Sequence, residues 1–497
     1  MRAAILVTLA VSVIAACAHG GSKSDEATPS TYEPLARARA ALHARPSNPD
    51  ASVPLQCYAS TAGGRGGCWT CHTQGQGPNP VFDGHLQESY SFSEFAKVNR
   101  WRNAVTPAPA TPIDDGAILA WIRGDNYRAL KGALAAIPLS QYPGFRPDLD
   151  LDAGLDADGF AKDGSRWRAI RYKPFPGAFF PTNGGAGDVF VRLPLALAKD
   201  RPTELRNFAT LEAAIRGDGG LPSMYEGSSV AVEAQLFPQG TEILHTVRYL
   251  DPDAPNLLSR RLKELRWMKK AKSKDVWARN RAHEKAIAEK EENTVPVYAG
   301  NAVGGLENAQ GWLLQAFIED ELGRLRLQTD EEHRACMGCH GSLGVTVDAT
   351  FSFARKVPGA DGYRWQDLGG MKDAPMRGHA DPEILTWLRR LGAGDELGGN
   401  DELAARFFPG GVLAEAEVRR AAKGGDRDLA WLLAPSRARA LALDKAYLRL
   451  VRAQRFELGR DALLGKPPRL LARIESEETG LVAAKAVHLD ARLVLDW

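Results

Sequence analysis

The sequence predicts a mainly α-helical protein with two helical domains, a β-containing region inserted between them and a helical C-terminal region. Three observations lead to this prediction. A C-x-x-C-H motif occurs twice, at residues 68–72 and 336–340, and a tryptophan-bearing helical segment follows each copy. Short β-like runs punctuated by Gly and Pro occupy residues 141–255. Residues 398–497 are rich in Ala, Leu and Arg and are predicted to be mostly helical.

The two C-x-x-C-H motifs predict covalent attachment of haem. In such a motif two thiols add to the vinyl groups of the haem, and the adjacent histidine binds the iron. The predicted attachment residues are Cys68, Cys71 and His72 in the first motif and Cys336, Cys339 and His340 in the second. A zinc shell or paired disulfides would use the same cysteines, and these are the alternatives to haem.

Both motifs resemble those of the c-type cytochrome superfamily, and the resemblance covers the two haem segments. It implies two c-type haems in two cytochrome c-like domains, at residues 51–140 and 296–397. It also implies that the iron of each haem is bound by His72 or by His340. On this interpretation the region 141–255 is a separate β-rich middle domain.

The N-terminus predicts export. Met1 and Arg2 precede an apolar run that ends at Cys17, and this run is too short for a mature membrane span. The residues before Cys17 are similar to the lipobox of bacterial lipoproteins, which implies a signal peptide at 1–17 and a lipid anchor on Cys17. An ordinary signal peptide is the alternative. Residues 18–50 are predicted to be a flexible tether. We therefore expect a periplasmic or outer-membrane lipoprotein.

Charge gives little indication of a nucleic-acid partner, because 63 Lys and Arg residues face 61 Asp and Glu residues. The region 256–295 is predicted to be a charged helix with a partial leucine stripe. An exposed helix with i,i+4 ion pairs explains this pattern, and a docking surface for an acidic redox protein is the sharper alternative. After lipid and haem attachment, Cys57 is left without a predicted role.

The distal side of the first haem has no obvious ligand. By the resemblance, a Gly-x-Gly-Pro stretch places the carbonyl of Pro78 where it accepts a hydrogen bond from His72 Nδ1. A helix at 114–123 closes the domain. No methionine lies between His72 and Met224, so the candidates are His85, a ligand from elsewhere such as His245, or an open iron.

The second motif has more candidates. A helical pattern over 306–334 leads into it, and a closing helix is predicted at 382–391. Met371 and Met376 are the predicted distal ligands, with His379 as the third choice. A thioether ligand would raise the reduction potential relative to a second imidazole.

These features predict electron transfer through two covalently bound haems, with redox proteins as partners. The alternative is a dihaem peroxidase or oxidase in which one iron is open to substrate. No peroxidase-specific motif surrounds either haem segment, so whether the protein is an enzyme stays open.

Overall fold

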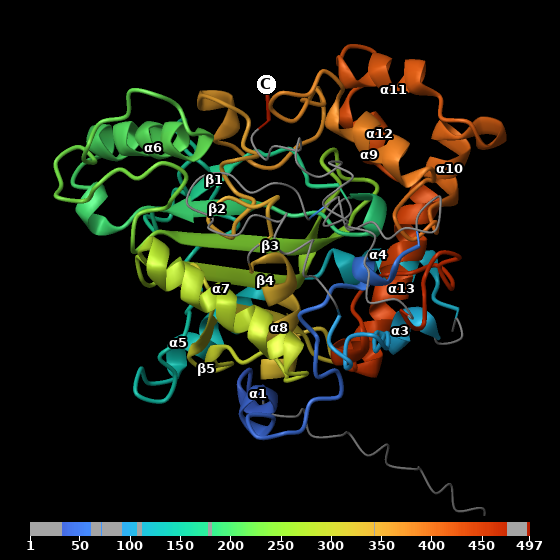
Figure 1. Ribbon diagram of the computed structural model, residues 1–497, viewed down its shortest axis with the longest axis horizontal. Helices are drawn as coiled ribbons and strands as arrows, with labels where there is room; N and C mark the ends of the chain where they lie inside the picture. Colours follow the sequence, from blue (N-terminus) through green and yellow to red (C-terminus); the bar gives the residue numbers. More distant parts are fainter. Residues whose placement is uncertain are drawn as a thin grey trace, which may run out of the picture. The chain divides into compact units, whose positions relative to one another are not determined.

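An eight-stranded antiparallel sheet forms the centre of the computed structural model, which describes residues 32–60, 71, 92–106, 112–176, 181–341, 343–474 and 495–497. The strand order is β1-β2-β3-β4-β7-β6-β5, and β8 pairs with β7. Figure 1 shows β1 to β4 at the centre of the molecule. The strands are β1 (Arg168–Ile170), β2 (Val189–Arg192), β3 (Glu242–Leu250), β4 (Leu258–Lys270), β5 (Ala299–Asn301), β6 (Gly305–Glu307), β7 (Trp312–Glu319) and β8 (Leu325–Leu327).

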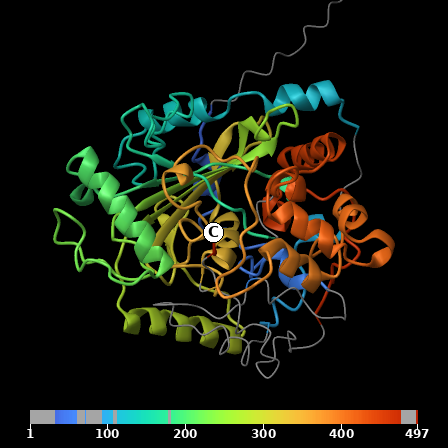
Figure 2. The ribbon, with the colours of Figure 1, turned by 90° about the horizontal axis from the view of Figure 1, so that it is seen from above.

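Helices cover the sheet on its faces and at one side. They are α1 (Ala36–Ala40), α3 (Arg102–Val105), α4 (Asp115–Ile122), α5 (Tyr127–Ala136), α6 (Arg201–Arg216), α7 (Val276–Glu291), α8 (Asp330–Cys339), α9 (Glu383–Leu391), α10 (Asp401–Phe407), α11 (Glu415–Ala422), α12 (Leu429–Leu433) and α13 (Arg437–Ala453). Helices α9 to α13 gather on the side of the sheet away from α6, as the orange and red ribbons of Figure 2 show. Residues 34–497 form one compact unit.

The register of β3 and β4 sorts their side chains onto two faces. Leu244 pairs with Trp267, and His245 pairs with Arg266. Because successive residues of a strand point to opposite faces, His245 and Arg266 share one face while Leu244 and Trp267 share the other.

The two faces carry different cores. One face packs against α5 and α1 through a cluster that includes Phe190, Leu265 and Phe317, which we call the filled face. The opposite face packs against α6, Met337 of α8 and residues 345–354, and we call it the cavity face because a large cavity lies there.

The mainly α prediction is wrong, because helices hold 33% of the residues and a large antiparallel sheet accompanies them. The error comes from residues 258–270 and 312–319, which are strands β4 and β7. Both are buried on their two faces, so the apolar side chains do not alternate strictly and their spacing resembles that of a helix. Charge was a second cause of the error, since Lys263 and Lys270 of β4 are buried and paired rather than exposed.

Several local predictions are confirmed. Helix α4 begins at the predicted acidic pair, where Asp114 accepts hydrogen bonds from the backbone N–H of Gly116 and Ala117. Helix α9 fills the predicted segment 382–391, and α7 is the part of 256–295 that is helical. Strands β1, β2 and β3 lie in the β-like runs of 141–255, but the sheet continues through β4 to β8 across the expected boundary at 255.

Candidate functional site

Helix α8 carries the second C-x-x-C-H motif at its C-terminal end. Thr329 and Glu332 form a capping box at the start of the helix, and His340 caps its end. Cys336, Cys339 and His340 stand at positions i, i+3 and i+4, so their side chains share one face of the helix. The cysteines are free thiols. Burial raises the pKa of both thiols, to about 11 for Cys339, so they stay protonated near neutral pH.

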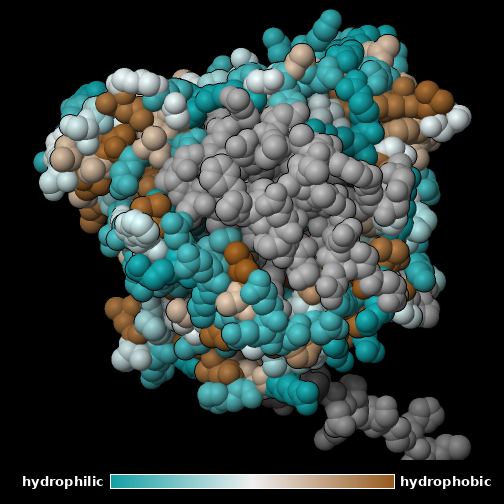
Figure 3. Space-filling view, in the orientation of Figure 1, coloured by the Kyte–Doolittle hydropathy of each residue, from teal (hydrophilic) through white to brown (hydrophobic). Residues whose placement is uncertain are grey.

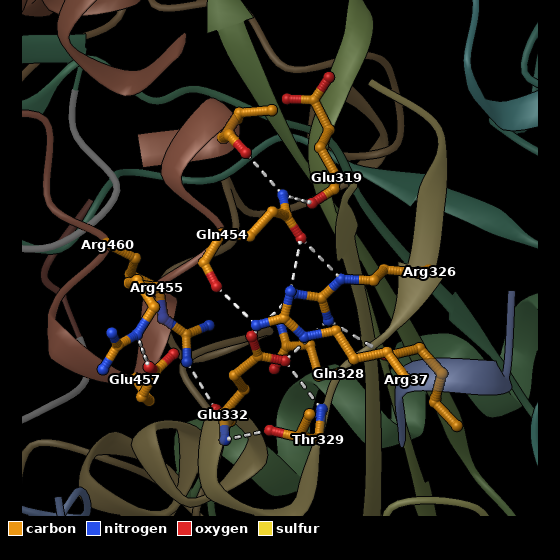
Figure 4. A network of polar contacts seen from close by, with 12 residues as sticks. Arg37, Glu319, Arg326, Gln328, Thr329, Glu332, Gln454, Arg455, Glu457 and Arg460 are labelled. Atoms are coloured by element: carbon orange, nitrogen blue, oxygen red, sulfur yellow. Dashed lines mark hydrogen bonds and ion pairs between the residues drawn. The ribbon is translucent and has the colours of Figure 1, made fainter. Parts of the chain in front are cut away.

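A buried polar network holds the first turn of α8 in place (Figure 4). Arg326 donates two hydrogen bonds to the Glu332 carboxylate, both at 2.9 Å, and the backbone N–H of Thr329 donates a third at 2.8 Å. Burial alone would raise the pKa of Glu332, but Arg326 and these hydrogen bonds lower it to about 2. Gln454 links the network to the end of α13 by accepting a hydrogen bond from Arg326.

His333 fixes α8 to the sheet. Its Nε2 accepts a hydrogen bond from the backbone N–H of Ala316 in β7 at 2.9 Å, so the proton of the neutral ring is on Nδ1, which donates to the carbonyl of Thr329. Burial lowers the pKa of His333, which agrees with a neutral ring. His333 is therefore a structural residue and is already engaged on both nitrogens.

A backbone carbonyl orients His340. Nδ1 of His340 lies 2.9 Å from the carbonyl oxygen of Ala349. Donation from Nδ1 to this oxygen leaves Nε2 as the nitrogen with a free lone pair. Burial lowers the pKa of His340 to about 4, so the ring is neutral near pH 7. Phe351 packs edge-on against the ring at 5.8 Å between centroids.

The carbonyl of Ala349 is presented by a tight turn between Val347 and Thr350. The backbone groups of Val347 and Thr350 hydrogen-bond each other in both directions, at 3.0 and 2.9 Å. Asp348 and Ala349 between them have φ values of 50° and 60°, the left-handed pair of a type I′ turn. Lys270 of β4 pairs with Asp348 at 2.6 Å and compensates the strain of this conformation.

A largely apolar cavity of about 920 Å³ lies beside the motif. It is bordered by the sheet face, the end of α8 and the segment 350–355; the lining residues are Ile170, Tyr172, Pro174, Phe175, Val189, Ile243, His245, Arg266, Trp267, Met268, Leu314, Gln315, Ala316, Cys336, His340, Thr350, Phe351, Ser352 and Arg355.

The sheet register brings His245 and Arg266 to this cavity from neighbouring strands. Burial, together with the nearby charges of Arg266 and of a protonated His340, lowers the pKa of His245 to about 3. His245 is therefore a neutral imidazole that shares a cavity with the imidazole of His340. Arg266 also bonds Glu264 at 2.9 Å.

A second, more polar cavity of about 1070 Å³ adjoins the first and shares Cys336, His340 and Arg266 with it. Cys339 borders this second cavity, together with the charged side chains of Lys263, Glu264, Arg460 and Asp461. Burial would raise the pKa of Glu264, but Arg266 and Arg460 lower it to about 2. Glu264 is consequently ionised and held between two guanidinium groups.

The first motif lies largely outside the described residues. Cys68, His72, Pro78 and His85 belong to that part of the chain, as does Cys17 of the predicted lipobox. Cys71 is described, and its carbonyl accepts a hydrogen bond from the backbone N–H of Val345 at 3.2 Å. Cys71 also packs against the same core cluster as Cys336. One cysteine of the first motif thus lies near the chain that follows the second motif.

The predicted methionine ligands lie elsewhere. Met371 packs into the cluster of α9, α11 and α12, and Met376 packs with Ala374 and Leu495. Among the described residues that line the cavity beside His340, neither methionine is present, nor is His379. The one cavity-lining thioether in that set belongs to Met268.

The sequence predictions missed the carbonyl of Ala349 and the place of His245. A backbone carbonyl leaves no trace in the sequence. From the sequence, His245 is a core or surface histidine or a haem ligand donated from elsewhere. The register that joins β3 to β4 and β7, and that places His245 beside the second motif, cannot be derived from the sequence. A signal for it did exist, because a histidine alternating with apolar residues in a central strand faces a core or a cavity.

The side chains around the second motif fit a covalently bound haem. The two adjoining cavities are bordered by two thiols and by a neutral imidazole whose Nε2 has a free lone pair. Arg266 lies beside them, and its guanidinium could pair with the carboxylate groups of a haem. Within the described part of the chain, no group of three or more His, Cys, Asp or Glu side chains is placed to hold a metal ion by itself. A haem iron needs only one or two protein ligands.

Comparison with known proteins points to lipoproteins. A family model described as “-like lipoprotein” matches residues 41–383, a range that includes both C-x-x-C-H motifs. An “Uncharacterized lipoprotein” from Aquifex aeolicus (strain VF5) is 31% identical, and the alignment covers 92% of this chain and 91% of that protein. No solved structure matches the chain. None of the helices in the described residues has the length and apolarity needed to cross a membrane.

These findings correct the resemblance to c-type cytochromes. The matching family is one of lipoproteins, and the fold around the second motif is a mixed α and β structure rather than a small helical cytochrome domain. A C-x-x-C-H motif specifies local chemistry at five residues, so it can occur on unrelated folds. Assignment of the chain to the cytochrome c superfamily from its motifs alone is therefore wrong.

Proposed function

The chain belongs to this lipoprotein family, and on that premise we propose that it carries covalently attached haem and transfers electrons. The observation that carries the proposal is the geometry at the end of α8. Cys336, Cys339 and His340 share one helix face beside a largely apolar cavity, and Ala349 holds Nδ1 of His340 so that Nε2 is available. The repeated motif at Cys68, Cys71 and His72 extends the proposal to two haems.

Attachment requires no oxidant. The S–H of each cysteine adds across one vinyl double bond, so that an S–C bond forms at one vinyl carbon and the hydrogen goes to the other. The bound haem supplies an iron that cycles between two oxidation states. The protein contributes the proximal imidazole of His340, its orientation by Ala349, and an apolar wall that limits access of water.

The family assignment makes the protein a lipoprotein. We propose the finer placement predicted from the sequence, an anchor on Cys17 that holds the protein in the periplasm or at the outer membrane. Attachment of c-type haem outside the cytoplasm is consistent with such export. Membrane fractionation of cells that produce the wild type or Cys17→Ala tests it, since loss of the lipid should move the protein to the soluble fraction.

Redox proteins are the proposed partners. Residues 256–295 do not form one basic docking helix, because the segment divides into strand β4 and helix α7. The cations Lys263, Arg266 and Lys270 of β4 lie inside the protein, where a partner cannot reach them. Figure 3 shows hydrophilic side chains interspersed with separate hydrophobic patches on the described part of one face. A mixed surface of this kind suits transient electron-transfer partners.

Enzymatic turnover at an open iron is the second candidate. The polar cavity beside Cys339 favours it, because Lys263, Glu264 and Arg460 could bind a polar substrate there. Rapid binding of carbon monoxide to one haem of the reduced protein would support this function. Two haems that both resist carbon monoxide would support electron transfer alone.

The decisive test of the proposal is a count of attached haems. Haem staining of denatured protein and intact mass should show two haems in the wild type and one in Cys336→Ser/Cys339→Ser. Cys57→Ser is the matched control, because Cys57 lies outside both motifs, and it should retain two. A wild type without covalent haem would overturn the proposal, and so would a double variant that keeps both haems.

A further inference from the structure

A histidine far from the motif in sequence, His245 on β3, borders the cavity that His340 also borders. The two imidazoles come from different layers of the fold: His340 from the end of α8, and His245 from the sheet face that α8 covers. Both side chains are half-buried, and His340 is one of the groups that lower the pKa of His245.

We infer that His245 supplies the second axial nitrogen to a haem iron bound by His340, an inference that rests on the proposed function of the second motif. The iron at this motif is then six-coordinate with two histidines. This differs from the sequence-based expectation of a methionine ligand from residues 371 or 376.

The position of His245 suits a ligand. It lies in the middle of β3, which is hydrogen-bonded to β2 on one side and to β4 on the other, with Val189 and Arg266 as its direct neighbours. A ligand on a central strand is held more precisely than one on a loop. Val189, Ile243 and Met268 surround it with apolar groups, which keeps the imidazole neutral and able to bind iron.

The other ligand-capable groups of the cavity fit less well. Tyr172 donates its hydroxyl hydrogen to the carbonyl of Gly187 at 3.1 Å, and burial raises its pKa, so the phenol stays protonated. Cys336 is required for the thioether. Met268 remains as a competing ligand, since its thioether lies on the same face as His245 in the neighbouring strand.

Two axial histidines have a functional consequence. An iron with both axial positions filled by protein does not bind substrate, and a second imidazole gives a lower reduction potential than a thioether. The second haem then belongs to an electron-transfer path. Any site open to substrate would have to be at the first motif.

The inference is tested on the full-length, haem-loaded protein, with Cys68→Ser/Cys71→Ser as a background that leaves one haem at residues 336–340. Optical and electron paramagnetic resonance spectra should show a low-spin iron in that background and in the wild type. His245→Ala should abolish the low-spin signal of this haem, permit rapid binding of carbon monoxide, and be rescued by added imidazole. His379→Ala, a histidine outside the cavity, should leave the spectra unchanged.

Two further variants guard against misfolding and against the competing ligand. His245→Met should keep the iron six-coordinate, add the charge-transfer band of a methionine ligand and raise the reduction potential. Met268→Leu should change none of these. A high-spin iron in the wild-type site, an unchanged spectrum in His245→Ala, or loss of the low-spin signal in Met268→Leu would each overturn the inference. Haem attached at Cys336 and Cys339 with any of these results would leave the proposed function standing, whereas its absence there would overturn both.

Discussion

The two faces of the sheet use the same strands in opposite ways. On the filled face, Trp267 stacks on Phe145 at 4.9 Å between ring centroids, and Leu130 and Leu134 of α5 are fully buried. On the cavity face, residues one step along the same strands border about 920 Å³ of space. One face is closed by aromatic and aliphatic side chains, while the other leaves a cavity.

The helices on the two faces are held differently as a result. Helix α5 is capped by Asp125, whose carboxylate accepts hydrogen bonds from the backbone N–H of Tyr127 and Arg128, and its apolar residues anchor it to the filled face. Helix α8 cannot fill the cavity that it borders, and it is held by the Arg326–Glu332 pair, the Thr329 cap and the His333–Ala316 hydrogen bond. A helix beside an open site is thus fixed by polar contacts at its base.

The largest expected effect is on stability, when the same substitution, Leu to Ala, is made on each face of the sheet. Leu265→Ala on the filled face should lower the free energy of unfolding by about 4 kcal/mol, because its surroundings cannot collapse. Leu314→Ala on β7 should cost about 2 kcal/mol, because this side chain already borders the cavity. Denaturant unfolding of both variants checks this. Equal losses in the free energy of unfolding would contradict the distinction between the filled face and the cavity face.

The next effect concerns acid stability. Glu332 has a pKa of about 2 in the folded protein against 4.5 ordinarily, so its stabilising contribution is complete above about pH 4.5. As the pH falls from 4.5 to 2, the unfolded chain takes up a proton that the folded one does not, and about 3 kcal/mol is lost. Glu332→Gln should therefore lower the free energy of unfolding by this amount at pH 7. Urea titrations at several pH values should show that the stability of this variant falls less steeply with acid than that of the wild type.

Glu415→Gln is the control for that experiment. Glu415 forms a two-pronged pair with Arg389 at the surface, and its exposed charge should contribute little. If Glu415→Gln lowers the free energy of unfolding as much as Glu332→Gln does, the buried network at the base of α8 stabilises the protein no more than a surface ion pair.

The smallest expected effect is on the cap of α8. Thr329→Ala removes the hydrogen bond from the backbone N–H of Glu332 and should cost about 1 kcal/mol. Ser436→Ala removes the equivalent cap of α13 and should cost the same. In the haem-loaded protein, Thr329→Ala but not Ser436→Ala should broaden the haem spectrum. If both variants leave the spectrum unchanged, the cap does not help to position the motif.

The sequence predicted single helices better than it predicted the fold. The motif at 336–340 and the helices α4 and α9 carry their signals within a few residues, as Asp114 does at the start of α4. Strands β4 and β7 did not, because burial on both faces removes the period of two that marks a strand. The positions of the Ala349 carbonyl and of the His245 side chain beside His340 depend on a turn and on a strand register that only the folded chain defines.

The pairing of β3 with β4 has a consequence for how the site tolerates mutation. A slip of β3 by one residue would turn His245 to the opposite face and remove it from the cavity, while Arg266 on β4 would stay there. The bulk of Trp267 and its stacking partner opposes that slip from the far side of the sheet. A random-mutagenesis screen for loss of haem binding should therefore return substitutions at Phe145, which stacks on Trp267 and is not among the residues that line the cavity.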